Sequence, residues 1–205
     1  MVVALKFSNL NHDTNGVSST MTIANLIDHL ETSVNWNKVF GVVCSTYNDE
    51  GFTSRADNFT KSTTIEKALA KFSDLKRVDQ IGHDFLFEDL KVELKMRQNL
   101  FYKRNPHQTQ VIKMKNFQGN KKTLEDFKQD QTFDVAIILC LTTFQVIVVE
   151  DEVARDRYFA DGDGVFAKFD LGDYYKCDIG EVTPILPPTS LSEEIQTGID
   201  RYLDF

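Results

Sequence analysis

The sequence has little cysteine and no long apolar run, and these absences exclude several classes of protein. Its three cysteines, Cys44, Cys140 and Cys177, are far apart and odd in number, which argues against a disulfide framework and a zinc site. The longest apolar run, 135–141, has the length of a strand and is too short to cross a membrane. The N-terminal residues lack a basic region followed by an apolar stretch. We therefore expect a cytoplasmic protein without a membrane segment.

The chain also lacks an excess of positive charge, because its formal net charge at pH 7 is −8. The charge is unevenly distributed, however. The segment from Lys91 to Lys128 holds ten Lys or Arg and three acids, so it carries +7 while the remainder carries −15. A basic segment in an otherwise acidic protein is typical of a local surface that binds a polyanion. The alternative is a solvated helix face, since helices rich in lysine are common.

The pattern of apolar residues predicts a single α/β domain over residues 1–205, with a central mixed β-sheet flanked by helices. Apolar residues at helical spacing and the capping pattern Thr63-x-x-Glu66 indicate helices in the first part of the chain. A buried strand is indicated by the continuous apolar run near the middle. The expected helices are 22–34, a helix opening at Thr63, 107–117, a short one opening at Thr123, and one after Ser190; the expected strands are 39–47, 80–87, 90–97, 133–141 and 144–150.

Residues 80–98 are predicted to form a hairpin with Glu88-Asp89 as its two-residue loop. In this register Asp84 lies opposite Glu93, and two carboxylates in this position destabilise a sheet unless a positive charge lies between them. Lys95 shares the face of Glu93, because side chains alternate along a strand. A divalent cation is the obvious candidate for the charge between the carboxylates, since hard cations bind carboxylate oxygens.

Asp84, followed after eight residues by Glu93-Leu94-Lys95, resembles the PD-(D/E)XK motif of the restriction-endonuclease-like nuclease superfamily. The predicted helix, hairpin, helix and buried strand over about 63–150 resemble the order of elements in the core of that superfamily. The proline of the motif is missing, because Gly82-His83 precedes Asp84. A chain of this length most resembles an orthodox, homodimeric type II restriction endonuclease.

The resemblance implies a Mg²⁺-dependent enzyme that hydrolyses phosphodiester bonds of double-stranded DNA and leaves a 5′-phosphate. Asp84 and Glu93 would hold one or two Mg²⁺ ions, which lower the pKa of a bound water. Lys95 would stabilise the developing negative charge or orient the water. Glu66, on the preceding helix, is a possible additional acid. A homodimer is implied, because cutting both strands of a palindrome requires two related active sites.

The basic segment supplies the candidate contacts to DNA. Phosphate contacts set the register of a protein on the duplex without reading its sequence, and a histidine at the start of a helix could reach base edges in a groove. The candidate DNA-binding residues are Arg97, Lys103, Arg104, His107, Lys113 and Lys115.

Three alternatives remain open from the sequence. The protein could be a repair, recombination or phage nuclease of the same fold that recognises DNA structure. It could be a non-catalytic nucleic-acid-binding or interaction protein. Finally, the motif could be a surface hairpin in which Asp84 and Glu93 pair with Lys91 and Lys95.

Overall fold

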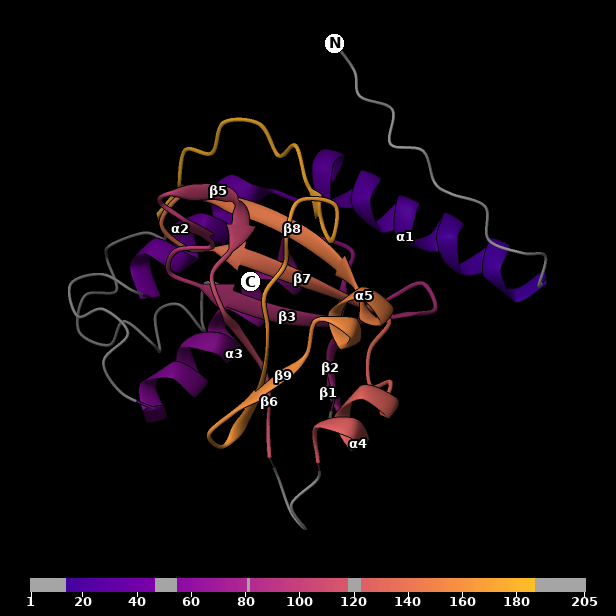
Figure 1. The fold of residues 1–205 in the computed structure, drawn as a ribbon. Coiled ribbons are helices and arrows are strands. Elements are labelled where there is room, and N and C mark those ends of the chain that lie inside the picture. Colours follow the sequence, from indigo (N-terminus) through magenta and orange to yellow (C-terminus); the bar gives the residue numbers. More distant parts are fainter. Residues whose placement is uncertain (1–13, 47–54, 81, 118–122, 187–205) are drawn as a thin grey trace.

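The computed structural model describes residues 14–46, 55–80, 82–117 and 123–186. Its centre is a six-stranded mixed sheet with the strand order β1-β2-β3-β7-β8-β11 (Figure 1). Strands β3 and β7 are parallel, and the other neighbouring pairs are antiparallel. The predicted α/β class and central mixed sheet are therefore confirmed. The strands are β1 (Lys76–Gln80), β2 (His83–Phe87), β3 (Leu90–Arg97), β7 (Val135–Cys140), β8 (Gln145–Glu150) and β11 (Tyr175–Lys176).

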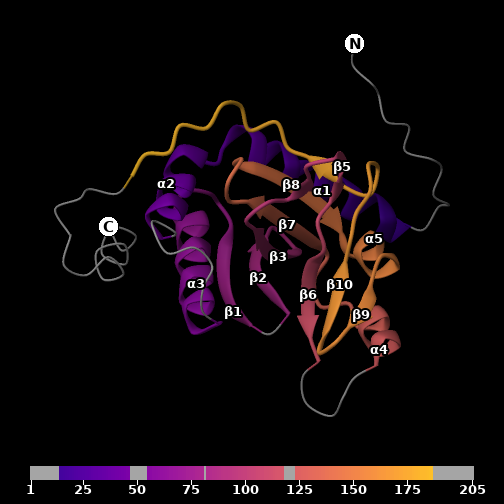
Figure 2. The same cartoon turned by 60° about the vertical axis from the view of Figure 1, so that its left-hand side comes forward.

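Three helices cover one face of this sheet (Figure 2). They are α1 (Thr14–Thr32), α2 (Trp36–Thr46) and α3 (Arg55–Lys71). Their buried side chains, such as Leu30, Phe40 and Leu69, form one apolar cluster with the sheet. Burial of this apolar surface is the main force that holds the helices on the sheet.

The opposite face is covered by a second, three-stranded sheet and two short helices (Figure 2). The small sheet has the order β6-β10-β9, and a two-stranded hairpin, β4-β5, precedes β6 in the chain. The bounds are β4 (Phe101–Tyr102), β5 (Asn105–Thr109), β6 (Ile112–Asn116), α4 (Leu124–Gln129), α5 (Asp151–Asp156), β9 (Phe159–Asp161) and β10 (Gly164–Ala167).

Strand β7 explains why both layers are needed. All six of its residues are buried, and they alternate between the two apolar clusters. Val135, Ile137 and Leu139 pack toward the helices, whereas Ala136, Ile138 and Cys140 pack toward the small sheet. The predictions of this strand, of β8 and of the short helix with a capping box at Thr123 are confirmed.

Two predicted elements are wrong, because a short apolar run is compatible with both a helix and a strand. The predicted strand 39–47 is helix α2, whose buried Trp36, Val39, Phe40 and Val43 have helical spacing. The predicted helix 107–117 consists of β5 and β6 instead. In β6 the buried and half-buried residues alternate with the period of a strand.

The start of helix α3 and the first strand of the hairpin also differ from the predictions. Helix α3 begins at Arg55, so Thr63 and Glu66 lie within it and do not form its N-terminal cap. The predicted strand 80–87 is divided between β1 and β2, which pair with each other. The chain turns at Gly82, whose φ of 104° is a conformation that residues with a Cβ rarely adopt. The predicted C-terminal helix lies outside the described residues, and no described helix is long and apolar enough to cross a membrane.

Candidate active site

The predicted hairpin register is confirmed for the pairs nearest the loop. Phe87 pairs with Leu90, Leu86 with Lys91, and Phe85 with Val92, so Glu88-Asp89 is the loop. Glu88 has a φ of 51°, which lets the chain reverse within two residues.

The predicted backbone pair of Asp84 with Glu93 is not part of the ladder. Asp84 lies one residue beyond the three observed pairs and binds β3 through its side chain. Its carboxylate oxygen Oδ2 accepts a hydrogen bond from the backbone N–H of Leu94, with a distance of 2.7 Å. This hydrogen bond fixes the Asp84 carboxylate beside the strand that carries Glu93 and Lys95. The structure therefore brings the three motif residues together.

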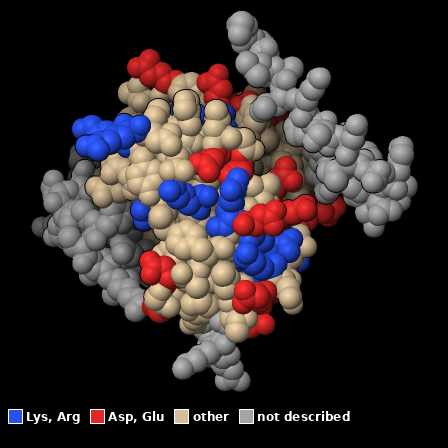
Figure 3. Space-filling model, in the orientation of Figure 1, with Lys and Arg blue, Asp and Glu red and all other residues tan. Residues whose placement is uncertain are grey.

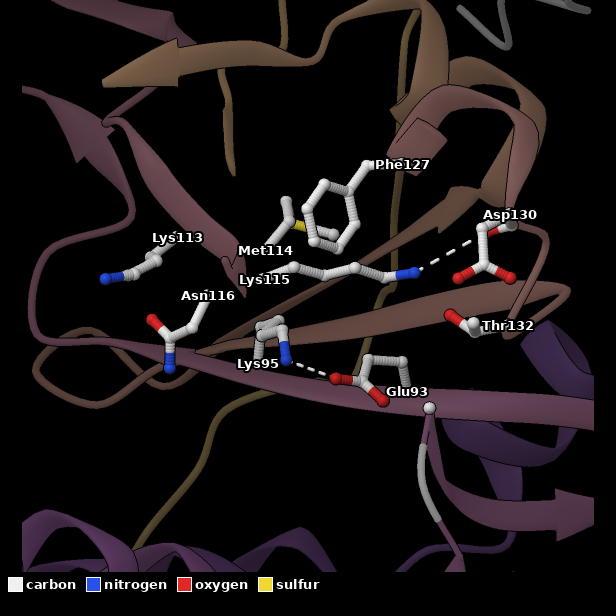
Figure 4. A pocket seen from close by; sticks show the side chains of 10 residues that line it. Glu93, Lys95, Lys113, Met114, Lys115, Asn116, Phe127, Asp130 and Thr132 are labelled. Atoms are coloured by element: carbon white, nitrogen blue, oxygen red, sulfur yellow. Dashed lines mark hydrogen bonds and ion pairs between the residues drawn. The ribbon is translucent and has the colours of Figure 1, made fainter. Parts of the chain in front are cut away.

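Glu93 and Lys95 point from β3 toward the small-sheet side of the molecule. In the parallel ladder they pair with Ala136 and Ile138, which pack on that side. Only 14% of the Glu93 side chain and 21% of the Lys95 side chain are exposed. The two side chains form an ion pair between Nζ and Oε1 (Figure 4). The surface-hairpin alternative predicts this pairing of Glu93 with Lys95, whereas the nuclease interpretation does not depend on it.

Burial and the charge of Glu93 raise the pKa of the Asp84 carboxyl above its usual value. The hydrogen bond from Leu94 and the charges of Lys95 and Arg77 oppose this shift without cancelling it. The carboxylate is therefore less stable here than in water, because burial removes hydration and a second anion lies nearby.

A cavity of about 500 Å³ lies between β3, β6 and α4 and has Glu93 and Lys95 on its wall (Figure 4). Lys113 and Lys115, on β6, contribute two further cations to its lining. Asp84 itself is absent from the lining, whereas Gly82 from the same turn is part of it. The cavity therefore has three ammonium groups and one of the two motif carboxylates on its wall.

Both lysines of β6 are held by neighbouring groups. The Lys113 ammonium lies 3.1 Å from an oxygen of Asp163 and 5.5 Å from the centre of the Phe166 ring. The Lys115 ammonium lies 5.5 Å from the centre of the Phe127 ring and 3.5 Å from the backbone oxygen of Asp130. These contacts orient the cations at the cavity. Asp130 and Phe127 were not singled out in the sequence, where nothing distinguishes them from ordinary residues of a short helix.

The other candidate residues do not join this cavity. Glu66 accepts hydrogen bonds from Ser62 and from Arg77, whose Nη2 lies 3.0 Å from Oε2. Arg97 donates a hydrogen bond to Gln110. Lys103, Arg104 and His107 are exposed at and beside the loop of the β4-β5 hairpin. In the view of Figure 3 basic and acidic side chains are interspersed, so the basic segment does not form one continuous surface on this face.

The two carboxylates fit a magnesium ion better than a metal that needs a complete protein cage. Among the described residues, no group of three or more His, Cys, Asp or Glu side chains gathers as a metal site. Mg²⁺ commonly takes one or two carboxylates and completes its coordination with water and phosphate oxygens.

Comparison of the sequence with protein-family models and with curated proteins finds no match to either.

Proposed function

We propose that the protein is a Mg²⁺-dependent endonuclease of double-stranded DNA with a restriction-endonuclease-like core. The observation that carries the proposal is that Glu93 and Lys95 line the cavity while Asp84 is hydrogen-bonded to Leu94 between them, in a sheet whose neighbouring strand β7 is entirely apolar. Charged groups are rarely buried for stability alone, because their desolvation is costly. Three charged groups gathered in the sheet, two of them on the wall of a cavity, are better explained by a reaction.

Asp84 and Glu93 would hold the metal, and Lys95 would act on the substrate. Bound Mg²⁺ would supply Lewis-acid activation of water and neutralise charge on the phosphate. The hydrogen bond from Leu94 keeps the Asp84 carboxylate oriented without using a second side chain. Lys95, adjacent to Glu93, would stabilise negative charge that develops on the phosphate in the transition state.

The cations of β6 support a polyanionic substrate. Lys113 and Lys115 face the same cavity as Lys95, so a phosphate entering it meets three ammonium groups from two different elements. Their contacts with Asp163 and Asp130 hold them in place before the substrate binds. A preorganised positive site is what phosphodiester binding requires.

A non-catalytic nucleic-acid-binding protein is the second candidate. It is favoured by the ion pairs of Glu93 with Lys95 and of Glu66 with Arg77, which neutralise these acids without a metal. The two candidates differ in what a metal does, because only the nuclease needs it for turnover.

The test is cleavage of unmethylated supercoiled plasmid by the purified full chain, with and without Mg²⁺. We expect cleavage with Mg²⁺ and a loss of at least about a hundredfold in Asp84→Ala and in Lys95→Ala. Thermal melting of both variants checks that they remain folded, and Lys76→Ala, which removes an exposed lysine of β1, is the matched control. Full activity in either site variant overturns the assignment.

The pattern of products separates the nuclease types. Discrete bands identify a sequence-specific restriction enzyme, whereas preferential cutting of branched or frayed DNA identifies a repair, recombination or phage nuclease. DNA binding without cleavage identifies the non-catalytic candidate. A restriction enzyme of this type would act as a homodimer, which the mass of the protein in solution tests directly.

A further inference from the structure

The hairpin β4-β5 connects the two strands that form the cavity walls. Strand β3, with Glu93 and Lys95, enters it, and β6, with Lys113 and Lys115, leaves it. Tyr102 pairs with Asn105, so Lys103 and Arg104 are the two residues of its loop. The hairpin is therefore an insertion between the two halves of the candidate site.

The loop of this hairpin is exposed and its cations are unpaired. All residues from Lys103 to His107 are exposed. Within the described part of the chain, neither Lys103 nor Arg104 has an ion-pair, hydrogen-bond or ring partner. Figure 3 shows basic side chains at the upper left, over this hairpin. These two cations thus differ from Lys95, Lys113 and Lys115, which already have partners.

The base of the hairpin, in contrast, is tightly held. Thr109 is fully buried and exchanges hydrogen bonds with Phe169, through its backbone N–H and its hydroxyl oxygen. The Tyr174 hydroxyl donates to the backbone oxygen of His107, and the Phe101 and Tyr174 rings are 5.7 Å apart. Lys168 lies over the Tyr102 ring. A rigid base presents the free loop in one position, as a recognition element requires.

We infer that the β4-β5 hairpin is the base-reading element of this protein, with Arg104 reading a base in the major groove and Lys103 binding a backbone phosphate. The inference rests on the proposed action on DNA. A two-stranded β-ribbon fits the major groove of DNA. The planar fork of arginine matches two acceptors of guanine, whereas a lysine ammonium is a point charge suited to phosphate.

The reach of the hairpin agrees with this assignment. Arg104 lies nine positions after Lys95, so their Cα atoms are at most about 32 Å apart. One turn of duplex DNA is about 34 Å long. The base read by Arg104 therefore lies within about one helical turn of the phosphate held at Lys95.

The test selects bound sequences from a pool of random duplexes with the full chain and Ca²⁺ in place of Mg²⁺, and it does not depend on cleavage. Wild type is compared with Lys103→Ala, Arg104→Ala and Arg104→Lys, and Lys76→Ala removes the same charge at a distant, exposed position. We expect both Arg104 variants to lose about tenfold to a hundredfold in discrimination at one position. Lys103→Ala should weaken binding to all sequences alike and reduce the salt slope by about one.

Each outcome bears on the inference separately from the proposed catalysis. If the Arg104 variants select the same sequences as wild type, Arg104 does not read a base. If Arg104→Lys keeps the sequence discrimination that Arg104→Ala loses, the guanidinium fork is not what reads the base. If wild type selects no sequence, the inference is overturned even though cleavage of plasmid continues. If wild type selects a sequence through Arg104 but never cleaves DNA, the base-reading hairpin stands and the nuclease proposal fails.

Discussion

The two faces of the central sheet are built from the same strands but carry different chemistry. Toward the helices, β3 presents the buried Val92 and Leu94, and β7 presents only apolar residues. Toward the small sheet, β7 is again apolar, but β3 presents Glu93 and Lys95. The helical side is therefore a core alone, whereas the other side combines a core with a charged cavity. Because side chains alternate along a strand, β3 places its apolar residues in the core and its charged residues at the candidate site.

The largest expected effect comes from truncating β7 on either face. Ile137→Ala opens a cavity in the helical cluster, and Ile138→Ala opens one in the cluster under the small sheet, since both side chains are fully buried. Each should lower the free energy of unfolding by about 2–5 kcal/mol. Urea unfolding measures both. A negligible loss for Ile138→Ala would show that the small sheet does not close over its face.

The segment 183–186 packs against helix α2, on the helical side of the sheet. Its residue Ile185 donates a backbone hydrogen bond of 2.8 Å to the carbonyl oxygen of Asn37. A Cβ added to Gly41 of α2 would clash with the backbone oxygen of Ile185. Gly41→Ala should displace this segment and cost about 1–3 kcal/mol. Hydrogen exchange at the Ile185 amide measures the displacement, with Cys44→Ala on the same helix as the control. Unchanged protection would contradict the close packing.

On the charged side, removing the charge of Asp84 should increase stability at neutral pH. The raised pKa means that folding favours the protonated carboxyl, so its contribution is full below the ordinary aspartate pKa and is lost as the pH rises through the raised value. Asp84→Asn should therefore unfold at a higher urea concentration than wild type at pH 7. This increase in the unfolding midpoint should be smaller than the decrease caused by Ile137→Ala or Ile138→Ala. The difference should shrink as the pH falls toward 4.

The control for this prediction is Asp89→Asn, which removes one carboxylate from the exposed hairpin loop. It should change the unfolding midpoint little at either pH. Added Mg²⁺ sharpens the comparison, because it should stabilise wild type and leave Asp84→Asn unaffected. Equal stabilisation of both proteins would place the bound metal elsewhere.

The smallest effect concerns thiol reactivity. Burial, aided by the charge of Glu31, raises the pKa of Cys177 to about 12, so the thiol is almost entirely protonated at pH 8 and is a poor nucleophile. Cys177, which is 5% exposed, should remain unmodified by iodoacetamide in the folded protein, while the half-buried Cys44 reacts faster. Peptide mass mapping distinguishes the two. Rapid labelling of Cys177 would mean that this part of the helical cluster opens easily.

Strong local patterns determined much of the candidate site. The loop Glu88-Asp89 between two alternating segments fixed the hairpin register, because a two-residue connection leaves little freedom in pairing. The continuous apolar run of β7 identified a strand buried on both faces. The capping pattern at Thr123 placed the start of α4.

Only the tertiary structure decided the rest. The β-branched run of α2 and the segment of β5 and β6 have ambiguous local preferences, and packing against the sheet selected the helix in one case and strands in the other. The turn at Gly82 likewise divided one predicted strand into two. The sequence alone predicted that Asp84, Glu93 and Lys95 lie close together, because they belong to one hairpin. It could not reveal that β6 brings Lys113 and Lys115 to the same cavity, because that contact depends on how two sheets pack.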